Sequence, residues 1–139
     1  MERLEQKYTV MINAGLALER SIKKYNQPPA YADQEDRAAY ETTLIKRFEP
    51  CYEMTWKFLK IYLKQNFGTE TIGSKDVFRQ CLTHKILGEA EVAQLLAMIE
   101  DRNLAAHDYD QEAAGVLCSK ISSMYYPILN NTVDSFLKS

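Results

Sequence analysis

The sequence predicts an all-α protein, and its composition and its apolar periodicity both indicate this. Of 139 residues only 5 are glycine and 4 are proline, too few for the turns that many short strands would need. Apolar residues recur at alternating spacings of three and four, which is the period of an amphipathic helix. A chain of this length can bury one ordinary core, so we expect a single domain over residues 1–139.

The first segment has the cleanest helical pattern in the chain. Its apolar seam consists of Leu4, Tyr8, Met11, Gly15, Leu18, Ile22 and Tyr25. The two prolines of "NQPPAYAD" cannot continue a helix, and the next helical pattern begins after Asp33 or Asp36. We therefore expect two long helices separated by a loop.

The second helical segment carries two overlapping apolar stripes. One comprises Leu44, Phe48, Cys51, Thr55, Phe58 and Tyr62, and the other Ile45, Tyr52, Trp56, Leu59 and Leu63. Two stripes predict a helix that is contacted on two sides, as at the centre of a bundle. Pro50 lies inside this pattern, where it removes a backbone donor and crowds the carbonyl of Lys46, so we expect a kink.

The remaining chain predicts a short helix and two longer ones. Ser74 is the expected N-cap of the short helix, which runs from Lys75 to about His84. The segment "LGEAEVAQLLAMIEDRNL" is the next helix, and its acidic first turn suits the helix dipole. Together, these segments predict an up-and-down four-helix-type bundle with one extra short helix.

The last helix should begin near Asp108 or Asp110. Asp108 and Gln111 have the spacing of a capping box. The apolar stripe of this helix comprises Ala114, Leu117, Ile121, Met124 and Ile128. Pro127 falls within the stripe, so we expect it to bend the helix.

Charge and cysteine usage narrow the class of protein. The formal net charge of −2 excludes a broad basic surface that would hold nucleic acid by phosphate neutralisation alone. Cys51, Cys81 and Cys118 are odd in number and stand in apolar contexts, which predicts buried free thiols and a reducing cytoplasm. With 2 histidines and no Cys-His cluster, a zinc site is not expected. Neither a signal peptide nor a membrane span is expected, because charges interrupt every apolar run.

Polar residues interrupt the fourth helix where its apolar pattern should continue. The stripe expected to be buried is Val92, Leu96 and Ile99, followed by Asn103 and His107. The neighbouring stripe is Leu95, Met98 and Arg102. An ideal helix separates Arg102 from His107 by roughly 140° around its axis. These two side chains meet only if the helix ends or bends between them, or if a second chain completes the site.

Two interpretations of this interruption remain open from the spacing. In the first, Arg102 and His107 interact with the last carbonyls of a helix, and Asp108 caps the helix that follows. In the second, the guanidinium holds a phosphate and a histidine with a pKa near its usual value of roughly 6.5 moves a proton. The spacing alone does not decide between them.

Arg102, His107 and Tyr109 together form the string Arg-x4-His-x-Tyr within "DRNLAAHDYD". This string resembles the signature of HEPN-domain proteins of the HepT type, also described as nucleotidyltransferase substrate-binding proteins. A second block, "IKRFEPCYEMTWKFLKIYL", resembles the second helix of that family, and its matching positions are Phe48, Glu49, Glu53, Trp56 and Lys57. The segment "SKDVFRQCLTHKIL" before the motif helix also agrees, so the resemblance covers nearly the whole chain.

The resemblance implies a helical bundle that pairs as a homodimer and brings two motif helices together in a cleft. Active members are metal-independent ribonucleases that need no cofactor, and each is the toxin of a toxin–antitoxin pair. Their antitoxin is a minimal nucleotidyltransferase that transfers AMP from ATP to the motif tyrosine, here Tyr109. The implied roles are a general acid or base for His107, phosphate binding for Arg102, and orientation of one of them for Asn103.

RNA hydrolysis suits these residue types, because RNA carries its own nucleophile in the 2′-OH. The enzyme then supplies a proton acceptor, a proton donor and a cation for the phosphate. AMP on Tyr109 would place bulk and negative charge two residues from His107 and would pair with Arg102. The alternatives are a non-catalytic substrate-binding subunit of a two-component nucleotidyltransferase and a purely structural helical dimer.

Four further residues are candidates for support of the cleft. Glu49, Glu53 and Lys57 stand at spacings of four on the second helix, and Asp108 follows His107 in the motif. The three helical residues form either a salt-bridge ladder on the surface or part of the border of the cleft.

Overall fold

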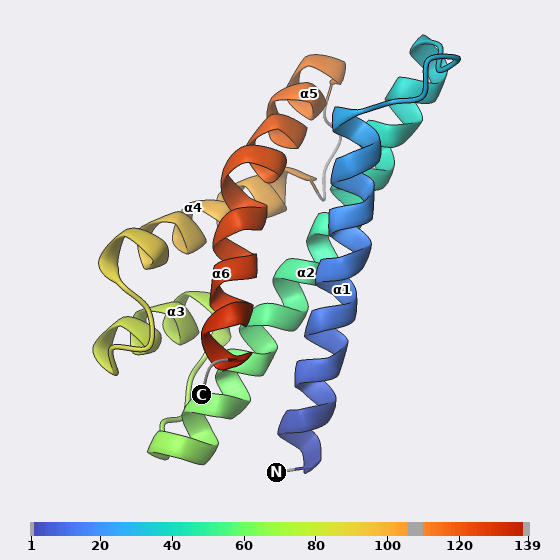
Figure 1. The fold of residues 1–139 in the computed structure, drawn as a ribbon. Helices are drawn as coiled ribbons and strands as arrows, with labels where there is room; N and C mark the ends of the chain where they lie inside the picture. The colour runs from blue at the N-terminus through green and yellow to red at the C-terminus, as the bar shows by residue number, and fades with distance from the viewer. Residues whose placement is uncertain (1, 106–109, 138–139) are drawn as a thin grey trace.

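The computed structural model describes residues 2–105 and 110–137, and this part of the chain is helical with short connections and contains no strand (Figure 1). The elements are α1 (Glu2–Asn26), α2 (Gln34–Phe67), α3 (Gly73–Thr83), α4 (Glu89–Ala105), α5 (Gln111–Lys120), the π-helical segment η1 (Ile121–Tyr125) and α6 (Tyr126–Leu137). In Figure 1, α1, α2 and the rod formed by α5, η1 and α6 lie side by side, while α3 and α4 cover one flank. The predicted all-α bundle is confirmed.

The first two helices follow the sequence pattern closely. Met11 and Leu18 of α1 are fully buried against the core, and both predicted stripes of α2 are buried or partly buried. Asp33 caps α2 in a reciprocal box: the Asp36 N–H donates to Asp33 Oδ1 at 2.8 Å, and the Asp33 N–H donates to Asp36 Oδ2 at 3.1 Å. The helix is unbroken through Pro50, and the predicted kink there stays a prediction.

The prediction for the start of α3 was wrong. Its N-cap is Ile72, whose backbone N–H donates to the Asp76 carboxylate at 2.9 Å. This bond starts the helix earlier and leaves Ser74 in the first turn. The Ser74 hydroxyl instead accepts a hydrogen bond from the Tyr52 hydroxyl of α2 at 3.1 Å. The serine therefore joins two helices rather than capping one.

The last helical rod starts at one of the two residues that the sequence predicted. Asp110 is the N-cap of α5, because its Oδ1 accepts from the Ala113 N–H at 2.7 Å. The predicted pairing of Asp108 with Gln111 stays a prediction, because Asp108 lies outside the described residues. Asp110, the other predicted start, is confirmed.

A π-helical segment, rather than one continuous α-helix, leads up to Pro127. The Tyr126 N–H bonds the carbonyl of Ile121, five residues back, and Pro127 has no N–H to continue an α-helical ladder. A π turn holds more residues than an α turn, so the buried stripe moves on by one position. Tyr125 and Leu129 are buried, while Met124, which was expected inside, is 44% exposed.

The three cysteines are free and buried, as the sequence predicted. Burial raises the pKa of the Cys51, Cys81 and Cys118 thiols to about 12, so all three are protonated and unreactive at neutral pH. Within the described ranges no helix has the length and apolar character that crossing a membrane requires.

Candidate functional site

Arg102 in the last turn of α4 connects the two sequence blocks that carry the family resemblance. Its Nη2 atom lies 2.6 Å from Glu53 Oε1 and 3.5 Å from Glu49 Oε1, both on α2. Lys57, one turn further along α2, places its Nζ 3.6 Å from the other oxygen of Glu53. The structure therefore brings Glu49, Glu53, Lys57 and Arg102 into one cluster. Within it, Arg102 and Glu53 are in contact although they are 49 positions apart in the sequence.

This cluster is open to solvent on one side. The Arg102 side chain is 31% exposed and that of Glu53 is 20% exposed. The formal charges of the four residues cancel, so Arg102 is held in place without a large excess of either charge. The Lys57–Glu53 ion pair matches the salt-bridge ladder that was one of the two predicted alternatives. Glu53 and Glu49 in addition contact Arg102, the arginine of the motif.

One donor of Arg102 is left open. Its Nε atom is buried and has no hydrogen-bond partner among the described residues. Buried N–H groups in folded proteins are nearly always paired, and an unpaired one calls for an explanation. An anion that arrives from solvent would contact the part of the Arg102 side chain that remains 31% exposed rather than this buried atom.

Asn103 is exposed, which corrects the prediction that it faces inward. The most buried stripe of α4 comprises Val92, Leu95 and Met98, and Arg102, not Asn103, continues it. Leu96 and Ile99, on the stripe that leads to Asn103, are only partly buried. Both stripes are equally apolar in sequence, and packing against the rest of the bundle selects the one that is buried.

The other motif residues, His107, Asp108 and Tyr109, lie outside the described residues. Their roles therefore stay predictions, as does the way in which Arg102 and His107 approach each other.

Sequence reasoning missed a second polar cluster beside Arg102. The Tyr125 hydroxyl of η1 donates to Asp101 Oδ2, and Lys120 Nζ lies 3.5 Å from the same oxygen. Tyr125 is 2% exposed, and its burial together with the Asp101 carboxylate raises the pKa of the phenol above its usual value. The only sequence signal for the burial of Tyr125 is its spacing of four from Ile121. Met124, at a spacing of three, fits the helical pattern equally well and was predicted instead. This cluster ties α4, at the residue next to Arg102, to the π segment.

Tyr125→Phe is expected to lower the free energy of unfolding by about 1–3 kcal/mol, because it removes a buried hydrogen bond to a charged group. The pH dependence of the free energy of unfolding is a second way to recognise the role of Tyr125. A phenol whose pKa is raised by folding stabilises the protein below the unfolded value of about 10, and this contribution is lost as pH rises beyond it. The fall in stability above about pH 10 should be smaller in Tyr125→Phe than in the wild type.

Urea unfolding at neutral and alkaline pH measures both effects. Tyr126→Phe is the matched control, because the Tyr126 hydroxyl bonds Glu19 of α1 at 3.2 Å instead of Asp101. Burial raises the pKa of Tyr126 to about 12, so this variant should also alter the alkaline limb. Only Tyr125→Phe should speed amide hydrogen exchange in the last turns of α4, and equal exchange in both variants would contradict the role of Tyr125.

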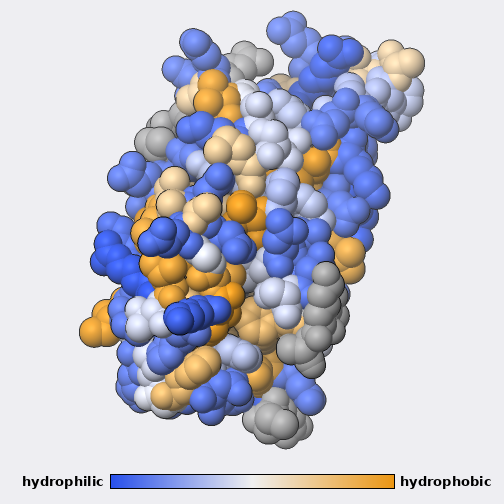
Figure 2. Space-filling view, turned by 60° about the vertical axis from the view of Figure 1, so that its left-hand side comes forward, coloured by the Kyte–Doolittle hydropathy of each residue, from blue (hydrophilic) through white to orange (hydrophobic). Residues whose placement is uncertain are grey.

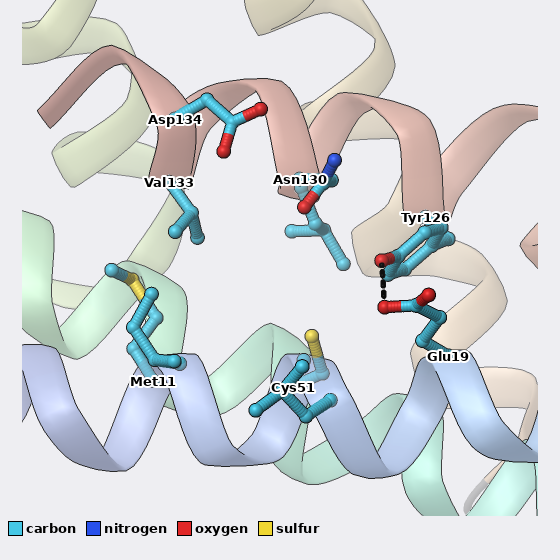
Figure 3. Close-up of a pocket in the computed structure, with 11 residues that line it drawn as sticks. Met11, Glu19, Cys51, Tyr126, Asn130, Val133 and Asp134 are labelled. Atoms are coloured by element: carbon cyan, nitrogen blue, oxygen red, sulfur yellow. Dashed lines mark hydrogen bonds between the residues drawn. The ribbon is translucent and has the colours of Figure 1, made fainter. Parts of the chain in front are cut away.

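A separate small cavity lies between α1, α2 and α6 (Figure 3). It has a volume of about 90 Å³, and Cys51 and Met11 line it. Figure 3 shows Tyr126 facing Glu19 at one end and Asp134 at the other. Neither Arg102 nor the residues that contact it line this cavity, so it is not part of the cluster on α2 and α4. No group of potential metal ligands occurs within the described ranges.

Comparison with known proteins gives a family match over almost the whole chain. The family model described as "Nucleotidyltransferase substrate binding protein like" matches residues 6–138. A protein named "Probable ribonuclease HepT", from Haemophilus influenzae (strain ATCC 51907 / DSM 11121 / KW20 / Rd), is 33% identical over 81 residues. The match covers 55% of this chain and 54% of that protein, so the chain spans about half the length of this curated relative.

Two solved structures share the fold. The protein ttk003001694 from Thermus thermophilus is 24% identical, with a TM-score of 0.63 over 87% of this chain and 96% of its own. The tri-AMPylated HEPN toxin of Shewanella oneidensis, in complex with its MNT antitoxin, is 18% identical, with a TM-score of 0.71 over 94% of this chain and 98% of its own.

Proposed function

Because this chain belongs to the nucleotidyltransferase substrate-binding-protein-like family, we propose that it is a metal-independent ribonuclease and the toxin of a toxin–antitoxin pair. The observation that carries the proposal is the contact of 2.6 Å between Arg102 and Glu53. It joins the motif helix to the second-helix block on which the family resemblance rests. The likeness to the probable ribonuclease of Haemophilus influenzae supports the same activity.

In the proposed reaction, the 2′-OH of the RNA attacks the adjacent phosphorus and the 5′-oxygen leaves. His107 moves a proton as general base or general acid. Arg102 binds a phosphate oxygen and stabilises the negative charge that develops there. Glu53 positions the guanidinium, and the Arg102 side chain remains 31% exposed to an approaching phosphate. In this proposal Asn103, which is exposed next to Arg102 in the sequence, orients the substrate or the histidine.

A homodimer is part of the proposal. Figure 2 brings forward the flank of α3 and α4, where hydrophobic residues gather between hydrophilic borders. In the single chain, Leu96 and Ile99 of α4 remain partly exposed. Met124 of η1 and Ile128 of α6 are also at least partly exposed. α4 packs against η1 and α6, so a second copy could cover both sets and bring two copies of the motif together.

The proposed partner is a minimal nucleotidyltransferase antitoxin that modifies Tyr109. The Tyr109 hydroxyl would attack the α-phosphorus of ATP, lose its proton and form the new P–O bond, while pyrophosphate leaves. The structural likeness to a tri-AMPylated toxin in complex with its MNT antitoxin supports this proposal. The added phosphodiester would block the site beside His107 and pair with Arg102.

Co-expression with a minimal nucleotidyltransferase of the proposed antitoxin class is expected to give AMP adducts on Tyr109 and to suppress RNA cleavage. Intact-mass analysis and peptide mapping locate the adducts. Tyr109→Phe should carry none at that position, and Tyr31→Phe is the control because Tyr31 is 83% exposed and therefore open to any unspecific transfer. Adducts on Tyr31 but not on Tyr109 would contradict the proposed modification.

The direct test of the ribonuclease is cleavage of RNA by the purified protein in EDTA, beside the Arg102→Ala and His107→Ala variants. Cleavage by the wild type that both variants lose is the expected result. Equal cleavage by all three proteins would identify a contaminant, and absence of cleavage by the wild type would refute the activity.

One observation favours the alternative, a non-catalytic substrate-binding subunit of a two-component nucleotidyltransferase. Arg102 is already paired with Glu53 and Glu49, and a phosphate must compete with both carboxylates. Binding of the nucleotidyltransferase without RNA cleavage in the EDTA assay would favour this alternative.

A further inference from the structure

A basic groove lies between α1 and α2, apart from the Arg102 cluster. It has a volume of about 350 Å³ and is lined by Arg20, Ser21 and Lys24 of α1 and by Tyr40, Thr43 and Arg47 of α2. No carboxylate is among its lining residues. A chain with a net charge of −2 thus places three cations in one hollow.

These three cations are free to bind an anion. Arg20, Lys24 and Arg47 are exposed, and none takes part in an ion pair within the described part of the chain. The neighbouring Lys23 differs, because it pairs with Glu19 at 3.2 Å. Mutual repulsion makes such a cluster unfavourable unless a ligand of opposite charge compensates it.

Aromatic and hydroxyl groups accompany the positive charge. The Lys24 ammonium lies 5.3 Å from the centre of the Tyr40 ring, and Ser21 and Thr43 add hydroxyls to the lining. An adjoining hollow shares Tyr40 and adds Arg37, with Glu41 as its only carboxylate. Cations along a groove beside an aromatic ring suit a single nucleic-acid strand, whose phosphates pair with the cations and one of whose bases stacks on the ring.

We infer that this groove binds the sugar–phosphate backbone of single-stranded RNA, as a second contact for the substrate; the inference rests on the proposed ribonuclease function. Helix α2 connects the groove with the Arg102 cluster. Arg47 lines the groove, and Glu49, two residues further along α2, contacts Arg102. Two residues of helix turn through roughly 200°, so the groove and Arg102 lie on opposite sides of a helix about 10–12 Å thick. The surface of α2 between them is exposed at Lys46 and Pro50. A strand of a few nucleotides can therefore pass around the helix, and its backbone contacts position the RNA without reading its sequence.

The test measures binding of a fluorescein-labelled oligouridylate of about twenty nucleotides to the full chain by anisotropy, at several salt concentrations. His107→Ala is the common background so that the RNA stays intact. Arg20→Gln/Arg47→Gln is expected to bind roughly tenfold more weakly, and the slope of log K against log salt should fall by about 1.4, the value for two lost phosphate contacts on a single strand.

Arg3→Gln/Arg79→Gln is the matched control. It removes the same charge from two exposed arginines at distant positions, and neither is in an ion pair within the described residues. This control should retain the slope of the parent protein. If the groove variant unfolds, Lys24→Gln replaces it, and its slope should fall by about 0.7.

Equal affinity and equal slope in the groove variant and the control would overturn the inference. Loss of binding to the nucleotidyltransferase, with RNA binding intact, would assign the groove to a protein partner and would also overturn it. Failure of the proposed function is a distinct result: the wild type would not cleave RNA in EDTA, while the slope of the groove variant would still fall.

Discussion

Replacing His107 by alanine is expected to lower the rate of RNA cleavage by about 10²–10⁴-fold, the usual contribution of a general acid or base. The 2′-OH and the leaving 5′-oxygen each exchange a proton during the reaction, and His107 is the motif residue whose usual pKa, roughly 6.5, suits this transfer near neutral pH. Single-turnover cleavage of a labelled RNA in EDTA measures the loss.

The chain offers a matched control in its other histidine. His84 closes α3, where its Nε2 lies 2.9 Å from the Thr69 hydroxyl and its ring stacks on Phe67 at 4.2 Å between centroids. We expect His84→Ala to cleave RNA at the wild-type rate once its folding is confirmed by circular dichroism. A wild-type rate in His107→Ala, or an equal loss in both variants, would exclude His107 as the group that transfers the proton.

Replacing Arg102 by alanine is expected to lower cleavage by about 10²–10³-fold, as when one group that stabilises transition-state charge is removed. Arg102→Lys should recover only part of this loss, because an ammonium keeps the charge but lacks the planar fork that holds Glu53 and a phosphate together. Arg79→Ala, at an exposed position on α3, is the control for loss of a surface arginine.

The stability of these variants separates catalysis from folding. The Arg102 side chain is 31% exposed, so its ion pairs should contribute less than about 1 kcal/mol to the free energy of unfolding. Urea unfolding of Arg102→Ala should therefore remain near the wild-type midpoint while cleavage is lost. A large fall in stability with proportionate loss of cleavage would instead make Arg102 a structural residue.

Where one apolar pattern dominated, the sequence was a reliable guide to the fold. The seam of α1 and the two stripes of α2 are long and regular, and both helices form with the predicted burial. The start of α2 after Asp33 was predictable for a similar reason, because the prolines before it end the preceding helix locally. Arg102 was singled out by the motif, and Glu53 by the second-helix block, before the structure joined them.

The sequence was ambiguous where two stripes were equally apolar. On α4 the stripe that leads to Arg102 is buried and the one that leads to Asn103 is not. On the last helical rod the π segment moves the buried position from Met124 to Tyr125. Periodicity cannot rank such stripes, because the choice depends on which neighbouring helix each one meets.

The amino-acid sequence by itself determined the all-α class, the two long helices and the identity of the motif residues, because these follow from local periodicity and from residue types at short spacings. Only the tertiary structure decided that Glu53 holds Arg102, that Tyr125 bonds Asp101, and that Arg20 and Arg47 share a groove. These contacts join residues far apart in the chain, and their geometry depends on how the helices pack rather than on the pattern within any one of them.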